Sequence, residues 1–600
     1  MILNTENLLD TVEESSYYWQ GEPKLIPSQH KPDINKPLAV DLFCGMGGLS
    51  LGFEEAGFEI LLGVDIHIPS IKTYARAHPR SACILGDIRK TLSSTVKHEN
   101  SMLYKIISSI IENKELDVLM AGIPCQGFSL ANKKRHPLDS RNHLFRYFLE
   151  AVKTLKPKCV VIENVEAIKR FNNGSFTNAI VCALKQEGYK TECNVLNAAD
   201  YGVPQTRKRM IFIGLKNGRD LIWPANLFGT NLKPYRTVFD AISDLPHVNA
   251  GESTSSYINK PKTEYQALMR KNSKSLFNHK APKHPKETIE RIEKTLPGMP
   301  MYDSYTQRIR LSWEKPSPTQ VSGGIRPQFQ FGHPEQPRGL TIRERCRIQS
   351  IPDHVYIEGQ VVQGRVQTGN VVPPLLANAI AKYIKIALNK ELFQEKLLTW
   401  GMSYKREFPW NNMHECLYKA LITEMLLRKT RAENLSAVYH DIMSLIPTID
   451  ALHKVEETEL ESALTPIGLS KTRVKAFKSL ANVIASKHNN EIPDNIEALM
   501  SLPHVGRYTA NATLLFHYDK KYPIVDINVA RIVSRVFGIN AALEIHKDEH
   551  LWEVVEYLFP DTQARDFGKC LLDFGAAVCK AKNPKCNSCI MGSMCTSRSK

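Results

Sequence analysis

Short apolar runs alternate with amphipathic stretches through the first two thirds of the chain. Runs of the length of buried strands occur at 38–43, 60–64, 118–121, 159–162 and 211–215. A stretch with helical spacing, 49–56, follows the first of them. Strands that alternate with helices predict an open, mostly parallel α/β sheet, and such sheets bind ligands at the carboxyl ends of their strands.

The pattern changes after residue 390. Apolar residues recur with helical spacing at 415–427, 435–445 and 472–484, and no strand pattern of any length appears. The sequence therefore predicts a multidomain protein. Residues 1–36 form a polar arm with several prolines, which we expect to be flexible or peripheral. Residues 37–390 form an α/β domain, and residues 391–600 form an all-α domain.

Composition narrows the class of partner. A net charge of +16 and a pI near 9.1 favour a polyanion, and nucleic acid is the commonest one; a basic protein without such a partner is the alternative. The sequence contains no run of about 18 apolar residues, so it predicts no transmembrane helix. Its polar, acidic N-terminus does not resemble a signal peptide. We therefore expect a cytoplasmic protein without a membrane partner, at the nucleoid of a bacterium or archaeon, with most of its 13 cysteines reduced.

Three predicted strands end in residues suited to a nucleoside. The first ends in the turn DLFCGMGGLSLGF, residues 41–53, whose glycines allow close backbone approach to a ligand. Asp65, at the end of the next strand, could accept hydrogen bonds from ribose hydroxyls, and Asp87 could receive an adenine amino group. The turn alone would fit a dinucleotide site, a methyl-donor site or no ligand, but the three strand ends together predict a nucleoside cofactor.

A cysteine ends the third strand, in the sequence GIPCQ, residues 122–126. An isolated Cys125 would more often be a small buried hydrophobe. Here the next strand end supplies Glu163, in ENV, and the segment QTRKR at 205–209 supplies arginines. These groups predict a reactive site at the edge of the sheet.

Residues 38–388 resemble the DNA cytosine-5 methyltransferase family, in the order of that family's motifs. The matching pieces are the glycine-rich turn, VD at 64–65, GDI at 86–88, PCQGFS at 124–129, ENV at 163–165, QTRKR at 205–209, LTIRERCRIQSIPD at 340–353 and QTGNVVPPLLANAIA at 367–381. Ile123 departs from the family, which often has a second proline there. We expect this difference to be tolerated, because the proline before the cysteine is kept.

The resemblance implies a mechanism and a cofactor. Cys125 would add to C6 of cytosine, Glu163 would hydrogen-bond N3 and the exocyclic amine, and Arg207 would hold the base or its phosphate. The target cytosine would have to be flipped out of double-stranded DNA. The interval at about 217–307, which lacks motifs, would be the target-recognition region. S-adenosyl-L-methionine would be bound by Asp41, Phe43, Gly45, Gly47, Asp65 and Asp87, with Asn370 closing the site.

The all-α part carries a hairpin sequence and a cysteine cluster. The segment LPHVGRYTA, residues 502–510, would expose backbone N–H groups at a helix N-terminus and bind phosphate, although it could be a simple helix–helix turn. Four cysteines with 6-2-5 spacing predict a metal site, for which zinc is the general alternative: Cys579, Cys586, Cys589 and Cys595.

This spacing resembles the iron–sulfur loop of the endonuclease III-like, helix-hairpin-helix DNA glycosylase superfamily, and the resemblance covers about residues 398–597. It implies a [4Fe–4S] cluster, and VDINVAR at 525–531 matches the superfamily's aspartate motif. His504 departs from the pattern, since a glycine usually stands there, and would take a positive φ.

Three positions bear on the base that is excised. Bifunctional members carry lysine where this chain has Tyr508, so β-elimination should be weak, and tyrosine there resembles the thymine–guanine mismatch glycosylases. Asp526 would stabilise the cationic sugar and Glu424 would assist base removal; ordinary helix-surface carboxylates are the alternative.

The resemblances predict a fused enzyme that methylates cytosine and removes the thymine left when 5-methylcytosine is deaminated. Two rivals stay open. The methyltransferase half could serve mainly as a sequence-specific module that delivers a glycosylase or nicking activity in a restriction or defence system. Alternatively, the second half could be an adapter with a structural cluster only.

Overall fold

The structure is a computed structural model that divides into two compact units, Met1–Leu388 and Asn389–Lys600. Each unit is described by itself. Cys125, the predicted nucleophile, lies outside the described residues. Those residues are 17–92, 101–112, 114–124, 144–170, 174–322, 329–404, 406–411, 415–539, 541–542 and 544–598.

The first unit is built on one mixed sheet. Its five central strands pair in parallel, whereas both edges are antiparallel. The five predicted apolar runs are present as strands. Two further strands, β1 and β7, were not predicted because they lie at the edges and are short or polar, and β4 was anticipated only through Asp87, which follows it. In spatial order the sheet consists of β1 (Lys24–Ile26), β4 (Ala82–Leu85), β3 (Glu59–Asp65), β2 (Leu38–Leu42), β5 (Val118–Gly122), β6 (Cys159–Val165), β8 (Lys208–Lys216) and β7 (Tyr189–Asn197).

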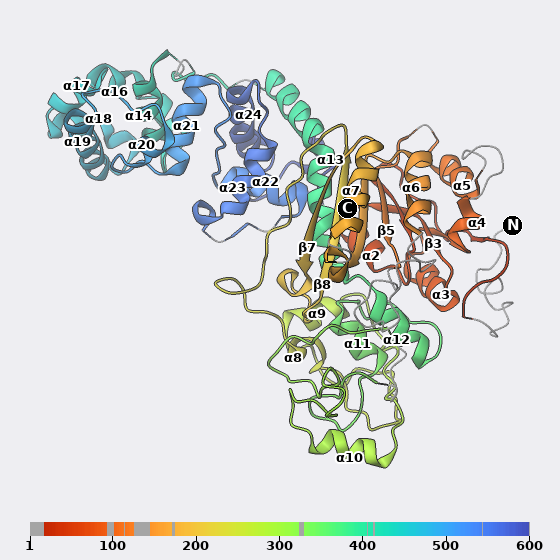
Figure 1. The fold of residues 1–600 in the computed structure, drawn as a ribbon. Helices are drawn as coiled ribbons and strands as arrows, with labels where there is room; N and C mark the ends of the chain where they lie inside the picture. The colour runs from red at the N-terminus through yellow and green to blue at the C-terminus, as the bar shows by residue number, and fades with distance from the viewer. Residues whose placement is uncertain are drawn as a thin grey trace. The chain divides into compact units, whose positions relative to one another are not determined.

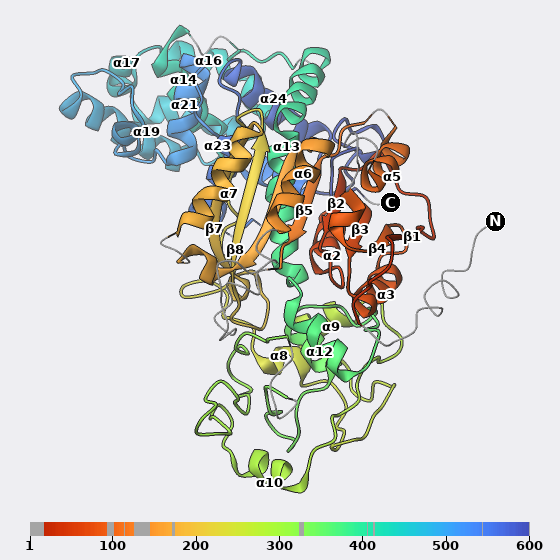
Figure 2. The same cartoon turned by 45° about the vertical axis from the view of Figure 1, so that its right-hand side comes forward.

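Helices cover both faces of this sheet (Figure 2). Because side chains alternate along a strand, Leu38, Val40 and Leu42 of β2 pack into one core and Ala39 into the other. The first core is shared with α6 (Leu144–Leu155) and α7 (Ser175–Gln186). The second is shared with α2 (Gly48–Glu55) and α13 (Pro374–Ser403).

Helix α13 belongs to the one stretch of the described chain, Val361–Ser403, that is long and apolar enough to cross a membrane by length and composition alone. Its Leu376, Ile380 and Ile384 are fully buried in the second core. The core helix of a sheet gives the same signal, and 72% of the most apolar window is buried.

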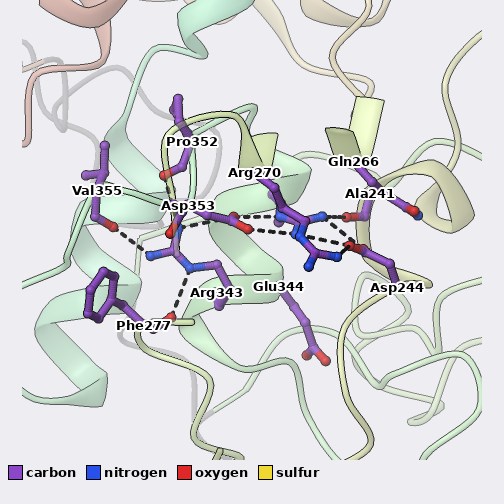
Figure 3. Close-up of polar contacts among 12 residues, drawn as sticks. Ala241, Asp244, Gln266, Arg270, Phe277, Arg343, Glu344, Pro352, Asp353 and Val355 are labelled. Carbon is purple, nitrogen blue, oxygen red and sulfur yellow. Dashed lines mark hydrogen bonds and ion pairs between the residues drawn. The ribbon is translucent and has the colours of Figure 1, made fainter. Parts of the chain in front are cut away.

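The later part of this unit contains short helices joined by irregular chain (Figure 1). The helices are α8 (Val238–Ile242), α9 (Glu264–Arg270), α10 (Lys286–Lys294), α11 (Ile342–Ile348) and α12 (Val361–Asn370). Buried ion pairs and hydrogen bonds stabilise this part of the unit. The Arg347 side chain donates to Asp353 and Asp244. The Arg343 side chain donates to backbone carbonyls of Phe277 and Val355 (Figure 3). Polar contacts of this kind explain why its sequence shows little periodicity.

The described residues of the second unit form helices joined by loops, without a strand, as predicted. Phe393, from the second half of α13, packs against Phe537 and Phe567 in its core. The predicted helix at 435–445 is broken between α15 and α16. The remaining helices are α14 (Leu417–Leu427), α15 (Ala432–Ser436), α16 (Tyr439–Leu445), α17 (Ile449–Lys454), α18 (Glu457–Leu464), α19 (Ser470–Lys487), α20 (Ile496–Met500), α21 (Arg507–Tyr518), α22 (Ile527–Phe537), α23 (Glu549–Leu558) and α24 (Ala564–Ala577).

Two candidate active sites

A cavity of about 270 Å³ lies in the first unit, where β2, β3, β5 and β6 end. It is lined by residues from six of the sequence motifs, which are far apart along the chain. Among its lining residues are seven of the predicted ones that the structure describes: Asp41, Phe43, Gly45, Asp65, Glu163, Arg207 and Asn370.

Asp65 shapes the glycine-rich turn at this cavity. Its carboxylate accepts hydrogen bonds from the backbone N–H of Gly45 and of His67, each at 2.8 Å. Phe43 and Gly45 both have positive φ, 57° and 56°, so the turn is tight. Burial raises the pKa of Asp65, against the effect of these hydrogen bonds.

Gly47 lies in the same glycine-rich turn, between the lining residues Met46 and Gly48. It has φ of 90°, and a Cβ there would lie 2.1 Å from Nε2 of His78. Gly47 lies outside the residues described as lining the cavity. Both its left-handed backbone and its packing against His78 require glycine at this position.

Asp41 and Asp87, the two other aspartates predicted to bind the cofactor, have different surroundings. Asp41 is fully buried, and its Oδ2 accepts a hydrogen bond from Ser50 Oγ at 2.7 Å, while its Oδ1 has no partner among the described residues. Burial raises the pKa of Asp41 to about 7. Asp87, in contrast, pairs with Arg89 Nε at 2.8 Å and is outside the residues that line the cavity.

Glu163 forms an ion pair with Arg209, whose Nε lies 2.8 Å from Oε1. Arg207 is 1% exposed and donates to the carbonyls of Gln320 and Gly369, so it fixes chain segments around the cavity. Sequence reasoning named Arg207 and overlooked Arg209. The antiparallel register, in which Arg209 pairs with Val165, brings Arg209 beside the end of β6.

The second unit brings Glu424, Tyr508 and Asp526 together. Glu424, on α14, is 3% exposed; its burial, and then the negative charge of Asp526, raise its pKa to about 8. Desolvation of the Tyr508 hydroxyl, and then the charges of Glu424 and Asp526, hold the Tyr508 pKa well above its ordinary value. Three groups from three helices thus form one electrostatically coupled cluster.

Asp526 begins α22 as its N-cap residue. Its Oδ1 accepts from the backbone N–H of Asn528 and Val529, at 2.8 and 2.7 Å, and its Oδ2 accepts from the Asn528 amide. Arg531 in turn donates to Asn528 Oδ1 and to the Cys579 carbonyl. Hydrogen bonds therefore connect the aspartate to the cysteine loop.

The loop carries four free, half-buried thiols. Burial, and also the charges of the other three cysteines, raise the pKa of Cys589. The Nη1 atom of Arg535 lies 3.7 Å from Cys579 Sγ. No group of three or more His, Cys, Asp or Glu side chains in the described residues is placed to hold a metal ion.

The predicted hairpin lies between α20 and α21. Gly506 is the N-cap of α21, which leaves the backbone N–H groups at the start of that helix outside its own ladder. His504 has φ of 62°, as expected for a non-glycine residue at this turn. Arg428 donates from Nη1 to the His504 carbonyl at 2.6 Å and holds the turn against the end of α14.

The fold and the two sites define a DNA-modifying enzyme joined to a DNA-repair domain, and comparison with known families agrees. Residues 39–386 match the C-5 cytosine-specific DNA methylases, and residues 422–557 match the HhH-GPD superfamily of base excision DNA repair proteins. The chain belongs to the C-5 cytosine-specific DNA methylase family, and its second unit is an HhH-GPD domain. The predicted fusion is confirmed.

Individual relatives match one unit or the other. The Type II methyltransferase M1.HphI of Haemophilus parahaemolyticus is 36% identical over 357 residues, which are 58% of this chain and 86% of that protein. The Type II methyltransferase M.AgeI of Thalassovita gelatinovora is 30% identical, over 58% of this chain and 99% of that protein. The thymine/uracil-DNA glycosylase of Methanothermobacter thermautotrophicus is 33% identical over 207 residues, or 34% of this chain and 93% of that protein.

Proposed function

We propose that the first unit methylates C5 of cytosine at a specific sequence in double-stranded DNA, with S-adenosyl-L-methionine as the methyl donor. The observation that carries this proposal is the cavity at the strand ends, which joins the Glu163–Arg209 pair to the glycine-rich turn. Relatives named as Type II methyltransferases support it.

The residues of the cavity fit this donor. Asp65 has carboxylate lone pairs left for ribose hydroxyls, because Oδ2 accepts one hydrogen bond from the Gly45 N–H and Oδ1 accepts one from the His67 N–H. The unpartnered Oδ1 of Asp41 suits a cationic ligand, and the donor carries both an ammonium and a sulfonium. When bound, S-adenosyl-L-methionine supplies the electrophilic methyl group. Asn370 lines the same cavity and would close it.

The protein's own groups would activate the base. The Cys125 thiolate forms a bond to C6 of a flipped-out cytosine, which makes C5 nucleophilic; after transfer, loss of the C5 proton releases the thiolate. Glu163 hydrogen-bonds N3 and the exocyclic amine. Arg209 holds the Glu163 carboxylate in place, whereas Arg207 keeps the surrounding chain in position.

A Cys125→Ala substitution tests this assignment. Methyl transfer should be abolished while donor binding persists, and wild-type protein should form a covalent complex with a duplex that carries 5-fluorocytosine at the target site. Cys182→Ala, at an exposed cysteine of α7, is the matched control and should transfer normally. Transfer by Cys125→Ala at the wild-type rate would refute the nucleophile.

For the second unit we propose excision of thymine opposite guanine without strand cleavage. The cluster of Glu424, Tyr508 and Asp526 carries this proposal, since Asp526 can stabilise a cationic sugar and Tyr508 offers no amine for a Schiff base. A relative named as a thymine/uracil-DNA glycosylase supports it. The fusion would remove the thymine that arises where the first unit has methylated.

Duplexes with one T:G pair test the substrate. Wild-type protein should leave an abasic site that breaks only after alkali or heat, and Tyr508→Lys should add direct strand cleavage. Adenine excision with T:G untouched would refute the substrate. Nicking by wild-type protein without alkali would instead favour delivery of a nicking activity in a defence system.

We further propose that Cys579, Cys586, Cys589 and Cys595 hold a [4Fe–4S] cluster. Support comes from four free thiols that influence one another electrostatically and from the hydrogen bonds of Arg531 and Arg535 to the same loop. Iron analysis should give about four atoms per chain. Stoichiometric zinc without iron would refute the cluster.

A further inference from the structure

The N-terminal segment is attached to the sheet at the end of β3. Tyr18 and His67 form an antiparallel bridge, the Trp19 N–H donates to the Ile66 carbonyl at 2.9 Å, and the Ile68 N–H donates to the Tyr17 carbonyl at 3.0 Å. This pairing follows directly after Asp65, the residue suited to ribose hydroxyls. The segment was expected to be flexible or peripheral, but residues 17–26 are part of the fold.

Two more contacts fix its position. Strand β1 pairs with β4, and a Cβ on Gly86 would lie 2.9 Å from Cα of Pro23, so the segment also packs on the end of β4. The Trp19 ring packs against a buried cluster that includes Ile26 and Ile71. The segment thus packs along the end of β3, at which we place the ribose of the donor, and along the neighbouring end of β4.

Tyr18 faces the donor cavity. It lines this cavity together with His67 and Ser70, and its ring centroid lies 5.3 Å from that of His67 with the planes tilted by 53°. The side chain is 48% exposed, so ring area is available to a ligand. His67 is in turn fixed by a 2.7 Å hydrogen bond between its Nδ1 and Ser70 Oγ.

We propose that Tyr18, backed by His67, is a wall of the donor site that contacts the adenosyl moiety, and that the N-terminal segment is therefore part of the methyltransferase active site. The inference rests on the proposed use of S-adenosyl-L-methionine. The flat π face of adenine gains from contact with an aromatic ring, and Tyr18 supplies such a ring beside Asp65. The segment is held by backbone pairing, so the ring is positioned before the ligand arrives.

The test measures binding of S-adenosylhomocysteine to the full chain by calorimetry, without DNA. Tyr18→Ala should raise Kd about five- to tenfold, the effect of losing one favourable aromatic contact. Tyr18→Phe keeps the ring and should stay within about twofold of wild type. Tyr17→Ala is the matched control, because Tyr17 is 45% exposed but outside the residues described as lining the cavity.

Amide hydrogen exchange separates ligand contact from a purely structural role. Without ligand, Tyr18→Ala should leave the protection of the Trp19 and Ile68 amides unchanged, because their hydrogen bonds use backbone atoms. Loss of that protection, or equal Kd values for Tyr18→Ala and wild type, would overturn the inference. If wild-type protein failed to bind S-adenosylhomocysteine, the donor assignment itself would be wrong.

Discussion

The buried carboxylates Asp353 and Glu424, one in each unit, have neighbours of opposite charge. In the first unit, Asp353 is fully buried, and burial opposes its ionisation, but Arg347 and Arg343 hold its pKa below the ordinary value. The Arg347 Nε lies 2.6 Å from Asp353 Oδ1, and its Nη1 lies 3.0 Å from Asp244 Oδ1. Each charge in this cluster is compensated by another.

Glu424 in the second unit is buried to a similar degree, yet the charge that most affects it is the negative charge of Asp526. Its pKa moves in the opposite direction, to about 8. An uncompensated carboxyl group destabilises a fold, and such groups concentrate at functional sites. We infer from the comparison that the compensated cluster supports structure, whereas Glu424, whose pKa is raised by burial and by a second carboxylate, is suited to chemistry.

The largest effect should come from breaking the compensated cluster. Arg347→Leu would leave Asp244 and Asp353 buried without their main partner, and we expect a loss of about 3–5 kcal/mol of stability. Scanning calorimetry of the full chain should show an earlier unfolding transition.

Arg76→Ala is the control for that measurement. Arg76 pairs with Glu358 at 2.7 Å, but its side chain is 60% exposed. An exposed pair of this kind contributes at most about 1 kcal/mol. If Arg347→Leu and Arg76→Ala had equal effects, the cluster would not have the structural role assigned to it.

Neutralising Asp526 should give the next largest effect. Asp526→Asn should slow thymine excision by about a hundredfold or more, because an amide cannot stabilise a cationic sugar as a carboxylate does. Asparagine is also a good N-cap residue, so α22 should keep its start and its stability. The measurement is single-turnover excision from a T:G duplex.

A second aspartate cap provides the matched control. Asp548 accepts from the Leu551 N–H at 3.0 Å and begins α23. Asp548→Asn therefore makes the same chemical change at another helix start, and excision should be unaffected. A comparable loss in both variants would show that capping, and not charge near the sugar, explains the effect of Asp526→Asn.

The sequence allowed us to name candidate residues that lie in local motifs. It did not allow us to name partners that come from distant parts of the chain. Asp526 and Tyr508 could be found because each lies in a short recognisable motif. The choice between Arg207 and Arg209 depends on the register of β8 against β6, which no local pattern reveals. The position of Tyr18 at the cavity also escaped prediction, because it depends on an antiparallel bridge to His67, which is distant in sequence.

The arginines of α11 show the same limit. The sequence IRERCRI would normally predict a solvated helix face, yet Arg343 and Arg347 are fully buried. Their burial depends on Asp244, which is far away in sequence, as well as on nearby Asp353. Glu424 was predicted as a site residue, but its raised pKa follows only from burial and from proximity to Asp526.

The smallest effect we expect is a pH dependence set by Glu424. With a pKa of about 8, its carboxyl group is mostly protonated at pH 7 and can donate a hydrogen bond to the departing base. Excision should therefore fall about tenfold between pH 7 and pH 9, in proportion to the protonated fraction. Glu424→Gln, which cannot ionise, should give a flat profile over this range.

Stability should respond to the same group with a defined sign. Between the ordinary pKa of 4.5 and about 8, the unfolded chain is ionised at Glu424 while the folded chain is protonated, so stability falls as pH rises through this window and levels off above it. Glu424→Gln should thus unfold at a higher temperature than wild type at pH 9, and by less at pH 5. Glu457→Gln, at an exposed position of α18, should shift neither the excision profile nor the unfolding temperature. A wild-type excision profile that stays flat to pH 9 would mean that Glu424 acts in its ionised form, and the contrast between the two units would then lose its functional meaning.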